Sequence, residues 1–324
     1  MKDFLLFSGW SEARHEPVAG DASSRSYTRL RRGKDTAILM QDPEGDVALF
    51  ARLAEYLTAI GLSAPRILAI DAAKWLLLIE DLGSDLFAAK LKDEPDQEGM
   101  LYQLATDVLL HLHDQAPPET LPVASVDHLA TATDLVFDCY LTGAGGTQND
   151  QAKADLRAAF QDVLSQHADV ADVMILRDYH AENLLWLPDR DGVRRAGVLD
   201  FQDALLGHRA YDLISLLEDA RRHVSDETRD HVINYYLSRT GADEAEFRTQ
   251  LCVLGAQRNL RILGVFARLA KVRGKPGYID LVPRVWAHIQ RDLDHPALGD
   301  IASIVSAHLP APTDAVLERL KTNV

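Results

Sequence analysis

The chain of 324 residues has little cysteine and lacks a long apolar run. Its cysteines are Cys139 and Cys252, and no Cys-x-x-Cys pair or His/Cys cluster has zinc spacing, which excludes a disulfide scaffold and a structural zinc site. The longest apolar stretches, such as Trp75 to Ile79, fall well short of the roughly 18 residues that a membrane-spanning helix needs. The apolar stretch near the N-terminus is also shorter than that of a secretory signal. We therefore expect a cytoplasmic protein with no membrane partner.

Positive charge is scarce as well. The 34 Lys and Arg residues face 49 Asp and Glu residues, and the net charge of -15 argues against a nucleic-acid partner, whose phosphates would be repelled. One segment departs from this balance, because Phe247 to Ile279 has no Asp or Glu but several basic residues. These are Arg248, Arg258, Arg261, Arg268, Lys271, Arg273 and Lys275. Either acidic helices elsewhere pair with this segment, or an anionic substrate binds near it.

Apolar residues make up 47% of the chain and charged residues 26%, which is typical of a globular enzyme long enough to form two lobes. The first 80 residues combine short strand-like runs with one segment of helical apolar spacing. The strand-like runs are Tyr27 to Leu30, Ala37 to Met40 and Trp75 to Ile79, and the helical segment is Val47 to Ile60. These elements predict a small, β-rich N-terminal lobe over residues 1–80.

A polar linker at about residues 80–84, Glu80-Asp81-Leu82-Gly83, follows this lobe. Residues 81–324 are predicted to form a larger, mostly helical C-terminal lobe, so the fold class is α+β with two lobes. The expected helices are roughly Gln97 to His113, Ala130 to Leu141, Gln151 to His167, Tyr211 to Arg222, Glu227 to Ser238, Ala245 to Ala270 and Ile279 to Leu293. Three short apolar runs among them, Met174 to Leu176, Leu184 to Leu187 and Ala196 to Leu199, are expected to be strands that hold a rigid loop.

The residues that carry chemistry lie around these three runs. Asp178 precedes Asn183 by five residues, between the first run and the second, and Asp200 follows the third run. The same order occurs in kinases, where a catalytic-loop Asp and Asn precede a metal-binding Asp-Phe. Phosphoryl transfer needs a carboxylate that accepts the acceptor's hydroxyl proton and oxygen ligands for magnesium. We therefore predict Asp178 as the base, with Arg177 beside it in the catalytic loop, and Asn183 and Asp200 as the metal ligands.

Each of these residues also has a purely structural interpretation. Asp178 and Asn183 could be turn residues that bind backbone groups, and Asp200 could cap a helix. An Asp and an Asn at this spacing occur often by chance. The joint order of strand, loop, strand, turn and strand, with the right residue at each end, favours kinase chemistry and a bilobal protein-kinase-like fold.

These motifs resemble the aminoglycoside phosphotransferase and choline kinase superfamily. Its catalytic loop reads His-Gly-Asp with an Asn five residues later, whereas this chain has Leu176 in the His place and Arg177 in the Gly place. The segment from Leu199 to Asp203 and the segment from Tyr211 to Leu217 are also similar to this superfamily. The resemblance implies that Asp212 supports the catalytic loop without touching substrate, and that the cofactors are ATP and Mg2+.

Within the superfamily the chain is most similar to bacterial anomeric N-acetylmuramate/N-acetylglucosamine kinases of cell-wall recycling. The motifs that carry this resemblance run over nearly the whole chain. They are Gly20 to Arg25, Ala64 to Leu68, Glu80 to Gly83, Arg177 to His180, Asp200 to Asp203 and Gln257 to Gly264. This resemblance implies a small-molecule partner, an amino sugar.

The nucleotide site is the least specific part of the pattern. Ser23, Ser24 and Arg25 lie in a turn that could cover phosphates with hydroxyl and backbone donors, although it lacks a glycine-rich fingerprint. Met40 stands where a kinase strand carries its phosphate-binding lysine, so another cation must replace it, with Arg25 and Lys34 as candidates. Backbone groups of Glu80 and Leu82 are expected to contact the adenine.

Four residues are candidates for the acceptor site. His180 follows the expected base by two residues and either faces the acceptor or makes a structural hydrogen bond. Asp203 is either a sugar-hydroxyl ligand or a helix cap. Arg258 and Arg261 lie nearly one helical turn apart, where they either bind a carboxylate or lie along the surface.

We therefore expect a small-molecule kinase that transfers the γ-phosphate of ATP to a hydroxyl group. The favoured acceptor is the anomeric hydroxyl of N-acetylmuramate or N-acetylglucosamine. An aminoglycoside, a choline-like alcohol or another sugar is the alternative substrate. A pseudokinase that binds nucleotide without turnover is the alternative of another class. Met40 favours this alternative, whereas the joint presence of Asp178, Asn183 and Asp200 argues against it.

Overall fold

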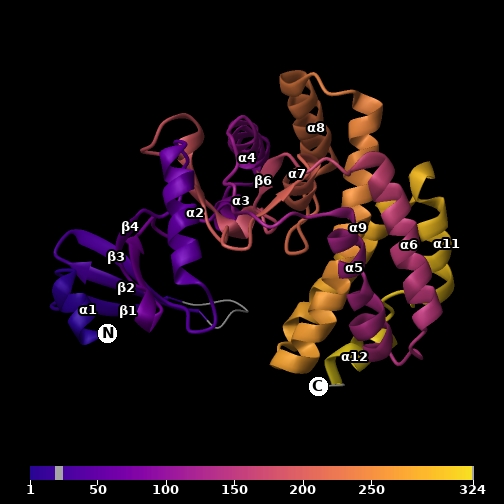
Figure 1. Ribbon diagram of the computed structural model, residues 1–324, viewed down its shortest axis with the longest axis horizontal. Helices are drawn as coiled ribbons and strands as arrows, with labels where there is room; N and C mark the ends of the chain where they lie inside the picture. The colour runs from indigo at the N-terminus through magenta and orange to yellow at the C-terminus, as the bar shows by residue number, and fades with distance from the viewer. Residues whose placement is uncertain (19–24, 323–324) are drawn as a thin grey trace. The chain divides into compact units, whose positions relative to one another are not determined.

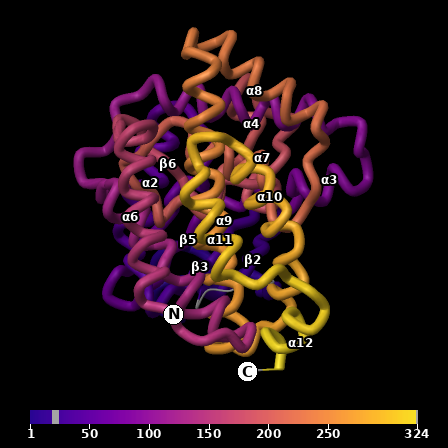
Figure 2. Tube along the Cα trace, turned by 90° about the vertical axis from the view of Figure 1, so that its right-hand side faces the viewer, coloured from indigo at the N-terminus to yellow at the C-terminus, as the bar shows by residue number. Residues whose placement is uncertain are grey.

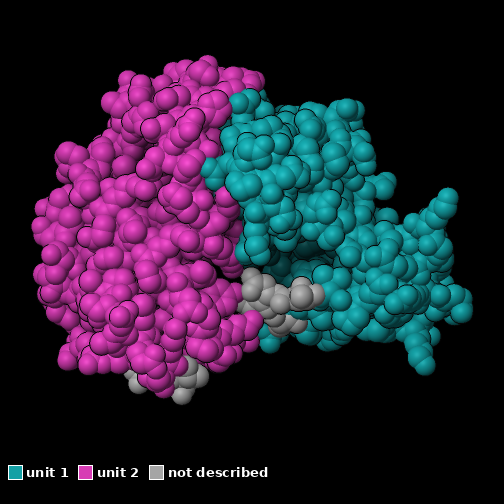
Figure 3. Space-filling view, turned by 180° about the vertical axis from the view of Figure 1, so that it is seen from behind, with its two compact units in different colours: residues 1–118, 181–204 teal, residues 119–180, 205–324 magenta. Residues whose placement is uncertain are grey.

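The computed structural model describes residues 1–18 and 25–322. The chain forms two compact units, which Figure 3 colours separately. The first comprises Met1–Pro118 and Ala181–Ala204, and the second comprises Glu119–His180 and Leu205–Val324. The catalytic-loop segment therefore continues from the second unit into the first between His180 and Ala181. Within the described residues, no helix is long and apolar enough to cross a membrane.

A five-stranded antiparallel sheet forms the first part of unit 1 (Figure 1). Its strand order is β1-β2-β3-β5-β4. The strands are β1 Arg14–Val18, β2 Ser26–Arg32, β3 Asp35–Gln41, β4 Ile67–Asp71 and β5 Leu76–Glu80. Leu39, Leu76 and Leu78 pack on one face with Phe4 and Leu5 of helix α1 (Lys2–Phe7). The two-residue side-chain period of a strand turns Met40 and Leu77 to the other face, where both are fully buried.

Helix α2 (Val47–Ala59) packs against β4 and β5 (Figure 1). It begins at Asp46, whose carboxylate accepts the backbone N–H of Leu49 at 2.9 Å and so satisfies one of the free donors of the first turn. Its residue Phe50 contacts Phe201, with ring centroids 4.8 Å apart. This contact connects α2 to the residue that follows Asp200.

The rest of unit 1 consists of helices α3 (Phe87–Asp93) and α4 (Glu98–His113) and a hairpin of β7 (Leu184–Trp186) and β8 (Ala196–Val198). The hairpin is bonded into the unit, because Trp186 N–H donates to Asp85 C=O at 2.7 Å and Val198 N–H donates to Ser63 C=O at 2.8 Å. These bonds explain why residues 181–204 belong to this unit. The first unit extends beyond residues 80–84, and the lobe boundary at this linker stays a prediction.

Unit 2 is mostly helical and also contains a pair of short strands, β6 (Val173–Ile175) and β9 (Leu205–Gly207). Helix α9 contacts α6, α7 and α10, and Figure 2 shows it among them. The helices are α5 Val126–Ala132, α6 Asp150–His167, α7 Ala210–Leu217, α8 Asp226–Thr240, α9 Glu244–Arg273, α10 Val282–Leu293, α11 Gly299–His308 and α12 Asp314–Thr322. Most of these confirm helices expected from apolar spacing.

Two expected helices are shorter or broken. The segment expected as one helix from Ala130 to Leu141 is divided into α5 and a π-helical turn, Val136–Leu141. The helix expected from Tyr211 to Arg222 ends at Leu217. The next residue, Glu218, leaves the helical conformation, and its buried side chain binds Arg229 and Asn259. Strands β1, β4 and β9 and helices α1, α3, α11 and α12 were not predicted.

Candidate active site

The loop that carries Asp178 begins where β6 ends. Arg177 has a φ angle of 72°, in the left-handed region that favours glycine. Asp178 N–H then donates to Leu176 C=O at 2.9 Å, which closes a tight turn. A related family with Gly at the position of Arg177 can adopt this turn without strain, whereas this chain adopts it with a side chain. The turn leaves Asp178 partly exposed.

Side chains of helix α7 form hydrogen bonds with the backbone of this loop. The carboxylate of Asp212 accepts two backbone N–H groups, that of Leu176 at 2.6 Å and that of Arg177 at 2.8 Å. The hydroxyl of Ser215, one turn further along, donates to Arg177 C=O at 3.1 Å. Asp212 is fully buried. It therefore supports the loop, the role that the sequence resemblance implied.

The protonation of Asp212 follows from its position. Burial raises its pKa to about 7, while the two backbone N–H groups and the positive charge of Arg258 act in the opposite direction. The carboxyl group would be harder to ionise in an apolar site without these donors. Asp212 thus changes charge near neutral pH while both its oxygens remain occupied by the loop.

His180 is buried in the same unit, beside two charged residues of the segment after α7. Its Nε2 lies 3.4 Å from Nη1 of Arg221. Burial lowers the pKa of His180, and Asp219 opposes this change while Arg221 and Arg258 add to it. Asp219 itself is buried and accepts the backbone N–H of Arg221 at 2.8 Å. His180 is therefore neutral at pH 7, so one ring nitrogen can donate a hydrogen bond and the other can accept one.

The two arginines predicted on α9 differ in their surroundings. Arg258 is 4% exposed, and its charge acts on Asp212 and His180, which places it close to the catalytic loop. Among the described residues, its Nε and Nη1 atoms have no hydrogen-bond partner. Arg261 is half-buried, and its charge, like that of Arg177, lowers the pKa of His128 after the larger effect of burial. Of the two alternatives for these arginines, a position along the surface does not hold for Arg258.

The two predicted metal ligands lie in unit 1 and are held side by side by the β7–β8 hairpin. Asn183 ends a short 3-10 turn just before β7, and its backbone C=O accepts the N–H of Leu199 at 3.0 Å. Asp200 follows Leu199 directly, with a φ angle of 57°. The backbone pairing thus continues past the strands and brings Asn183 next to Asp200.

The carboxylate of Asp200 already binds a positive group. Its Oδ1 accepts Nη1 of Arg25 at 3.0 Å and Nε2 of Gln202 at 2.9 Å. Carboxylate and amide oxygens, which Asp200 and Asn183 provide, are ligands of the kind that Mg2+ prefers, although Arg25 occupies one oxygen of Asp200 here. The residues present therefore fit a magnesium ion, with Asp200 as the charged ligand.

Arg25 joins Asp200 to a third residue, Asp42, which the sequence analysis did not select. Nε of Arg25 donates to Oδ2 of Asp42 at 3.0 Å. Asp42 follows β3 and is buried, and a Cβ atom added at Gly45 would lie 2.1 Å from its Oδ2. Glycine at position 45 is therefore required for this position of the carboxylate. No local signal identifies Asp42, because its partners are distant in the sequence.

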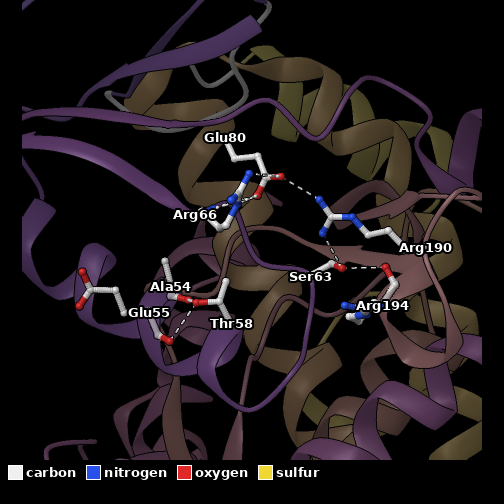
Figure 4. Close-up of polar contacts among 8 residues, drawn as sticks. All are labelled: Ala54, Glu55, Thr58, Ser63, Arg66, Glu80, Arg190 and Arg194. Atoms are coloured by element: carbon white, nitrogen blue, oxygen red, sulfur yellow. Dashed lines mark hydrogen bonds and ion pairs between the residues drawn. The ribbon is translucent and has the colours of Figure 1, made fainter. Parts of the chain in front are cut away.

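The linker residue Glu80 is bound through its side chain, as Figure 4 shows. Its carboxylate accepts Nε of Arg66 at 3.0 Å and Nη2 of Arg190 at 2.8 Å. Arg190 also donates to the hydroxyl of Ser63 at 2.7 Å, which donates in turn to Arg194 C=O. The backbone N–H of Glu80 donates to Arg66 C=O at 2.8 Å, so this donor is not available to an adenine. Contacts through the other backbone groups of the linker stay a prediction.

The remaining predicted residues have mixed positions. Ser23 and Ser24 lie outside the described residues. Met40 is fully buried opposite Tyr27 and Leu77 in the sheet register, and Leu82 is buried near Gly197. Asp203 is exposed and accepts Nε2 of Gln202 at 3.2 Å, next to Asp200. Their contacts with a ligand stay predictions.

Comparison with known proteins places this geometry in context. A sequence model of the phosphotransferase enzyme family matches residues 14–248. The N-acetylmuramate/N-acetylglucosamine kinase of Caulobacter vibrioides is 37% identical to the chain, over 96% of this chain and 96% of its own length. The protein of the same name from Pseudomonas aeruginosa is 30% identical, over 97% of this chain and 95% of its own length.

Solved structures with the same fold confirm the predicted fold class. A choline/ethanolamine kinase family protein from Mesorhizobium loti has a TM-score of 0.63 at 16% identity, covering 98% of this chain and 95% of that chain. An aminoglycoside-3'-phosphotransferase of type VIII has a TM-score of 0.56 at 16% identity, covering 82% of this chain and 98% of that chain. At these identities the likeness concerns the fold alone.

Proposed function

Because the chain belongs to the phosphotransferase enzyme family, we propose that it transfers the γ-phosphate of ATP to the anomeric hydroxyl of N-acetylmuramate or N-acetylglucosamine. The product would be a sugar 1-phosphate. The names of the relatives from Caulobacter vibrioides and Pseudomonas aeruginosa support this acceptor, since both align over nearly their full length. The observation that carries the proposal is the loop of Asp178, whose first residues, Leu176 and Arg177, are bound by Asp212 and Ser215 of α7.

Asp178 is the proposed general base. Its backbone is held by the turn at Leu176, and Asp212 and Ser215 bind the preceding peptide groups. A base in a fixed loop loses little freedom when it receives the acceptor's proton, which is the condition for efficient proton transfer. Asp178 would take the proton of the anomeric hydroxyl as that oxygen attacks the γ-phosphorus.

Asn183 and Asp200 would hold Mg2+, with the nucleotide phosphates completing its coordination. A bound magnesium ion neutralises charge on the phosphate oxygens during transfer. The pairing of Asn183 C=O with Leu199 N–H keeps these two residues adjacent before any ligand binds. The chain's own contribution is therefore to hold the backbones of Asn183 and Asp200 close together.

Arg258 is the proposed determinant of substrate charge. Burial of a guanidinium whose Nε and Nη1 have no partner among the described residues is costly, so a ligand with an anionic group would gain affinity there. N-acetylmuramate carries a lactyl carboxylate and N-acetylglucosamine does not. Arg258 also lies close to His180 and Asp212, both in or beneath the loop of Asp178. An ordered water molecule on Arg258 is the structural alternative.

The function is tested by transfer of radiolabelled phosphate from ATP to N-acetylmuramate, N-acetylglucosamine, kanamycin and choline. We expect labelled product with one or both amino sugars and dependence on Mg2+. Transfer to kanamycin or choline alone would move the chain to the alternative acceptor classes. Nucleotide binding without transfer to any acceptor would favour the pseudokinase interpretation.

The role of Arg258 is tested by comparing the two sugars in an Arg258→Ala variant. Loss of one charge-assisted hydrogen bond, about 1.5–3 kcal/mol, lowers kcat/KM for N-acetylmuramate by roughly 10- to 150-fold. N-acetylglucosamine should lose much less, because it has no carboxylate to bind. Arg268→Ala, which removes an exposed arginine from the same helix, is the matched control and should affect neither sugar. Equal losses with both sugars would show that Arg258 is structural.

A further inference from the structure

Arg25, Asp42 and Asp200 form one connected charge cluster in unit 1. Arg25 binds Asp42 through Nε and Asp200 through Nη1, both at 3.0 Å. The Arg25 and Asp42 side chains are 13% and 10% exposed, whereas that of Asp200 is 38% exposed. Of the two partners of the guanidinium, Asp42 is thus mostly buried and Asp200 is accessible to solvent.

The sheet register explains why Arg25 and not Lys34 reaches this place. Ser26 pairs with Gln41 across β2 and β3, so the residues just outside the pair, Arg25 and Asp42, lie at the same end of the hairpin. Lys34 lies in the turn at the opposite end and is exposed. The seven residues of a strand such as β2 span about 20 Å, beyond the reach of a lysine side chain.

The surrounding residues fix the position of the Asp42 side chain. Gly45 leaves room for its carboxylate, since an added Cβ would lie 2.1 Å from Oδ2 and 2.9 Å from Oδ1. Its backbone is fixed as well, because Asp42 N–H donates to Trp75 C=O at 3.0 Å. A buried carboxylate needs a charged partner or strong hydrogen bonds, and Arg25 supplies this partner.

The net charge of this cluster determines whether Arg25 can bind an anion. Two carboxylates and one guanidinium carry a net charge of about −1, which repels phosphate. A divalent cation bound to Asp200 makes the net charge of the cluster positive. The carboxylate of Asp200 is then neutralised by the cation and no longer needs the guanidinium. Nη1 of Arg25 is then available to an anion, while Nε stays bound to Asp42.

We propose that Arg25, held by Asp42, is the cation that binds the nucleotide phosphates in place of the strand lysine that Met40 replaces, and that it releases Asp200 when a divalent cation binds there. This inference rests on the proposed function, since it concerns the same nucleotide. It reverses the arrangement of kinases in which the strand supplies the cation and a helix supplies the carboxylate. Here the end of the strand supplies the carboxylate, and the residue before β2 supplies the cation.

Binding of ADP and of adenosine to the Arg25→Ala variant, measured by calorimetry without an acceptor sugar, tests the phosphate contact. We expect ADP to bind roughly 10- to 100-fold more weakly, the worth of one charge-assisted hydrogen bond, while adenosine binds as before. Asp42→Asn and Gly45→Ala should also weaken ADP binding, because the first removes the negative charge that holds Arg25 and the second displaces it. Arg31→Ala is the matched control, because Arg31 lies on β2, which Arg25 immediately precedes, and pairs with Glu16 at the surface.

The release of Asp200 is tested with Mn2+ as a spectroscopic probe, titrated in the absence of nucleotide. Arg25→Ala should bind Mn2+ more tightly than the wild type, because the guanidinium no longer competes for Asp200. The variant would thus gain affinity for the cation and lose affinity for ADP, a pair of opposite changes that damage to the fold cannot produce.

Two results would overturn the inference. One is an equal loss of ADP and adenosine, or unchanged ADP binding, in Arg25→Ala. The other is weaker or unchanged Mn2+ binding in that variant. Failure of the wild type to bind ADP at all would contradict the proposed function instead, so the two failures are distinguishable.

Discussion

Replacing Asp212 by asparagine should loosen the loop of Asp178 without removing any group that touches a substrate. Both oxygens of Asp212 accept a backbone N–H, one from Leu176 and one from Arg177. An asparagine side chain has only one oxygen, so one of these N–H groups would face an amide NH2. The variant loses one buried hydrogen bond and leaves a buried donor without an acceptor.

The expected cost is about 1–3 kcal/mol in the free energy of unfolding, the penalty for a buried polar group that loses its partner. Denaturant unfolding of both proteins measures it. Because the loop carries the proposed base, kcat should fall as well, whereas KM for ATP should change little. Ser215→Ala, which removes the neighbouring bond to Arg177 C=O, is a milder control and should lower stability and kcat less.

The pH dependence of the free energy of unfolding distinguishes the titration of Asp212 from a general loss of packing. Its pKa in the folded protein is raised from 3.8 to about 7, so the folded state binds a proton more tightly than the unfolded state. The stability that this group contributes is complete below pH 3.8 and declines as pH rises toward 7. Asp212→Asn should lack this decline. A constant difference in stability between the two proteins over that range, or an unchanged kcat, would refute the reasoning.

Three further variants test the loop and the metal ligands. Asp178→Asn should fold normally but lose roughly 10²- to 10⁴-fold in kcat, the usual contribution of a positioned base, and near-normal turnover would remove Asp178 from that role. Asp200→Ala should weaken the binding of magnesium nucleotide and abolish transfer, and an unchanged dependence on magnesium would mean that another carboxylate holds the metal. Arg177→Gly should be more stable in denaturant than Arg177→Ala by about 1 kcal/mol, because glycine adopts a φ angle of 72° without strain, and equal stabilities would show that the turn relaxes.

Local patterns were sufficient to predict the central strands and the order of the candidate site residues. The apolar runs around residues 174, 185 and 197 are short and bounded by polar loops, and they correspond to β6, β7 and β8 within one or two residues. Asn183 and Asp200 were predicted from the spacing of those runs. The hairpin pairing that makes them adjacent follows from the same runs, since Leu184 pairs with Val198.

Contacts between distant parts of the chain could not be predicted. Arg25 and Asp200 are 175 residues apart, so neither local spacing nor apolar periodicity relates them. The burial of Arg258 depends on the helices that surround α9, and the sequence alone left open whether this arginine binds a carboxylate or lies along the surface. Glu218 and Asp219 look like ordinary helix residues in the sequence, yet both are buried, and α7 ends before them at Leu217.

The position of the transferred phosphate tests the account most directly. Phosphorus-31 NMR of the product formed from ATP and N-acetylmuramate shows which sugar proton is coupled to the new phosphate. We predict coupling to the anomeric proton, together with its loss when Asp178→Asn replaces the wild type. A phosphate on another hydroxyl, or transfer that persists unchanged in the Asp178→Asn variant, would contradict the account.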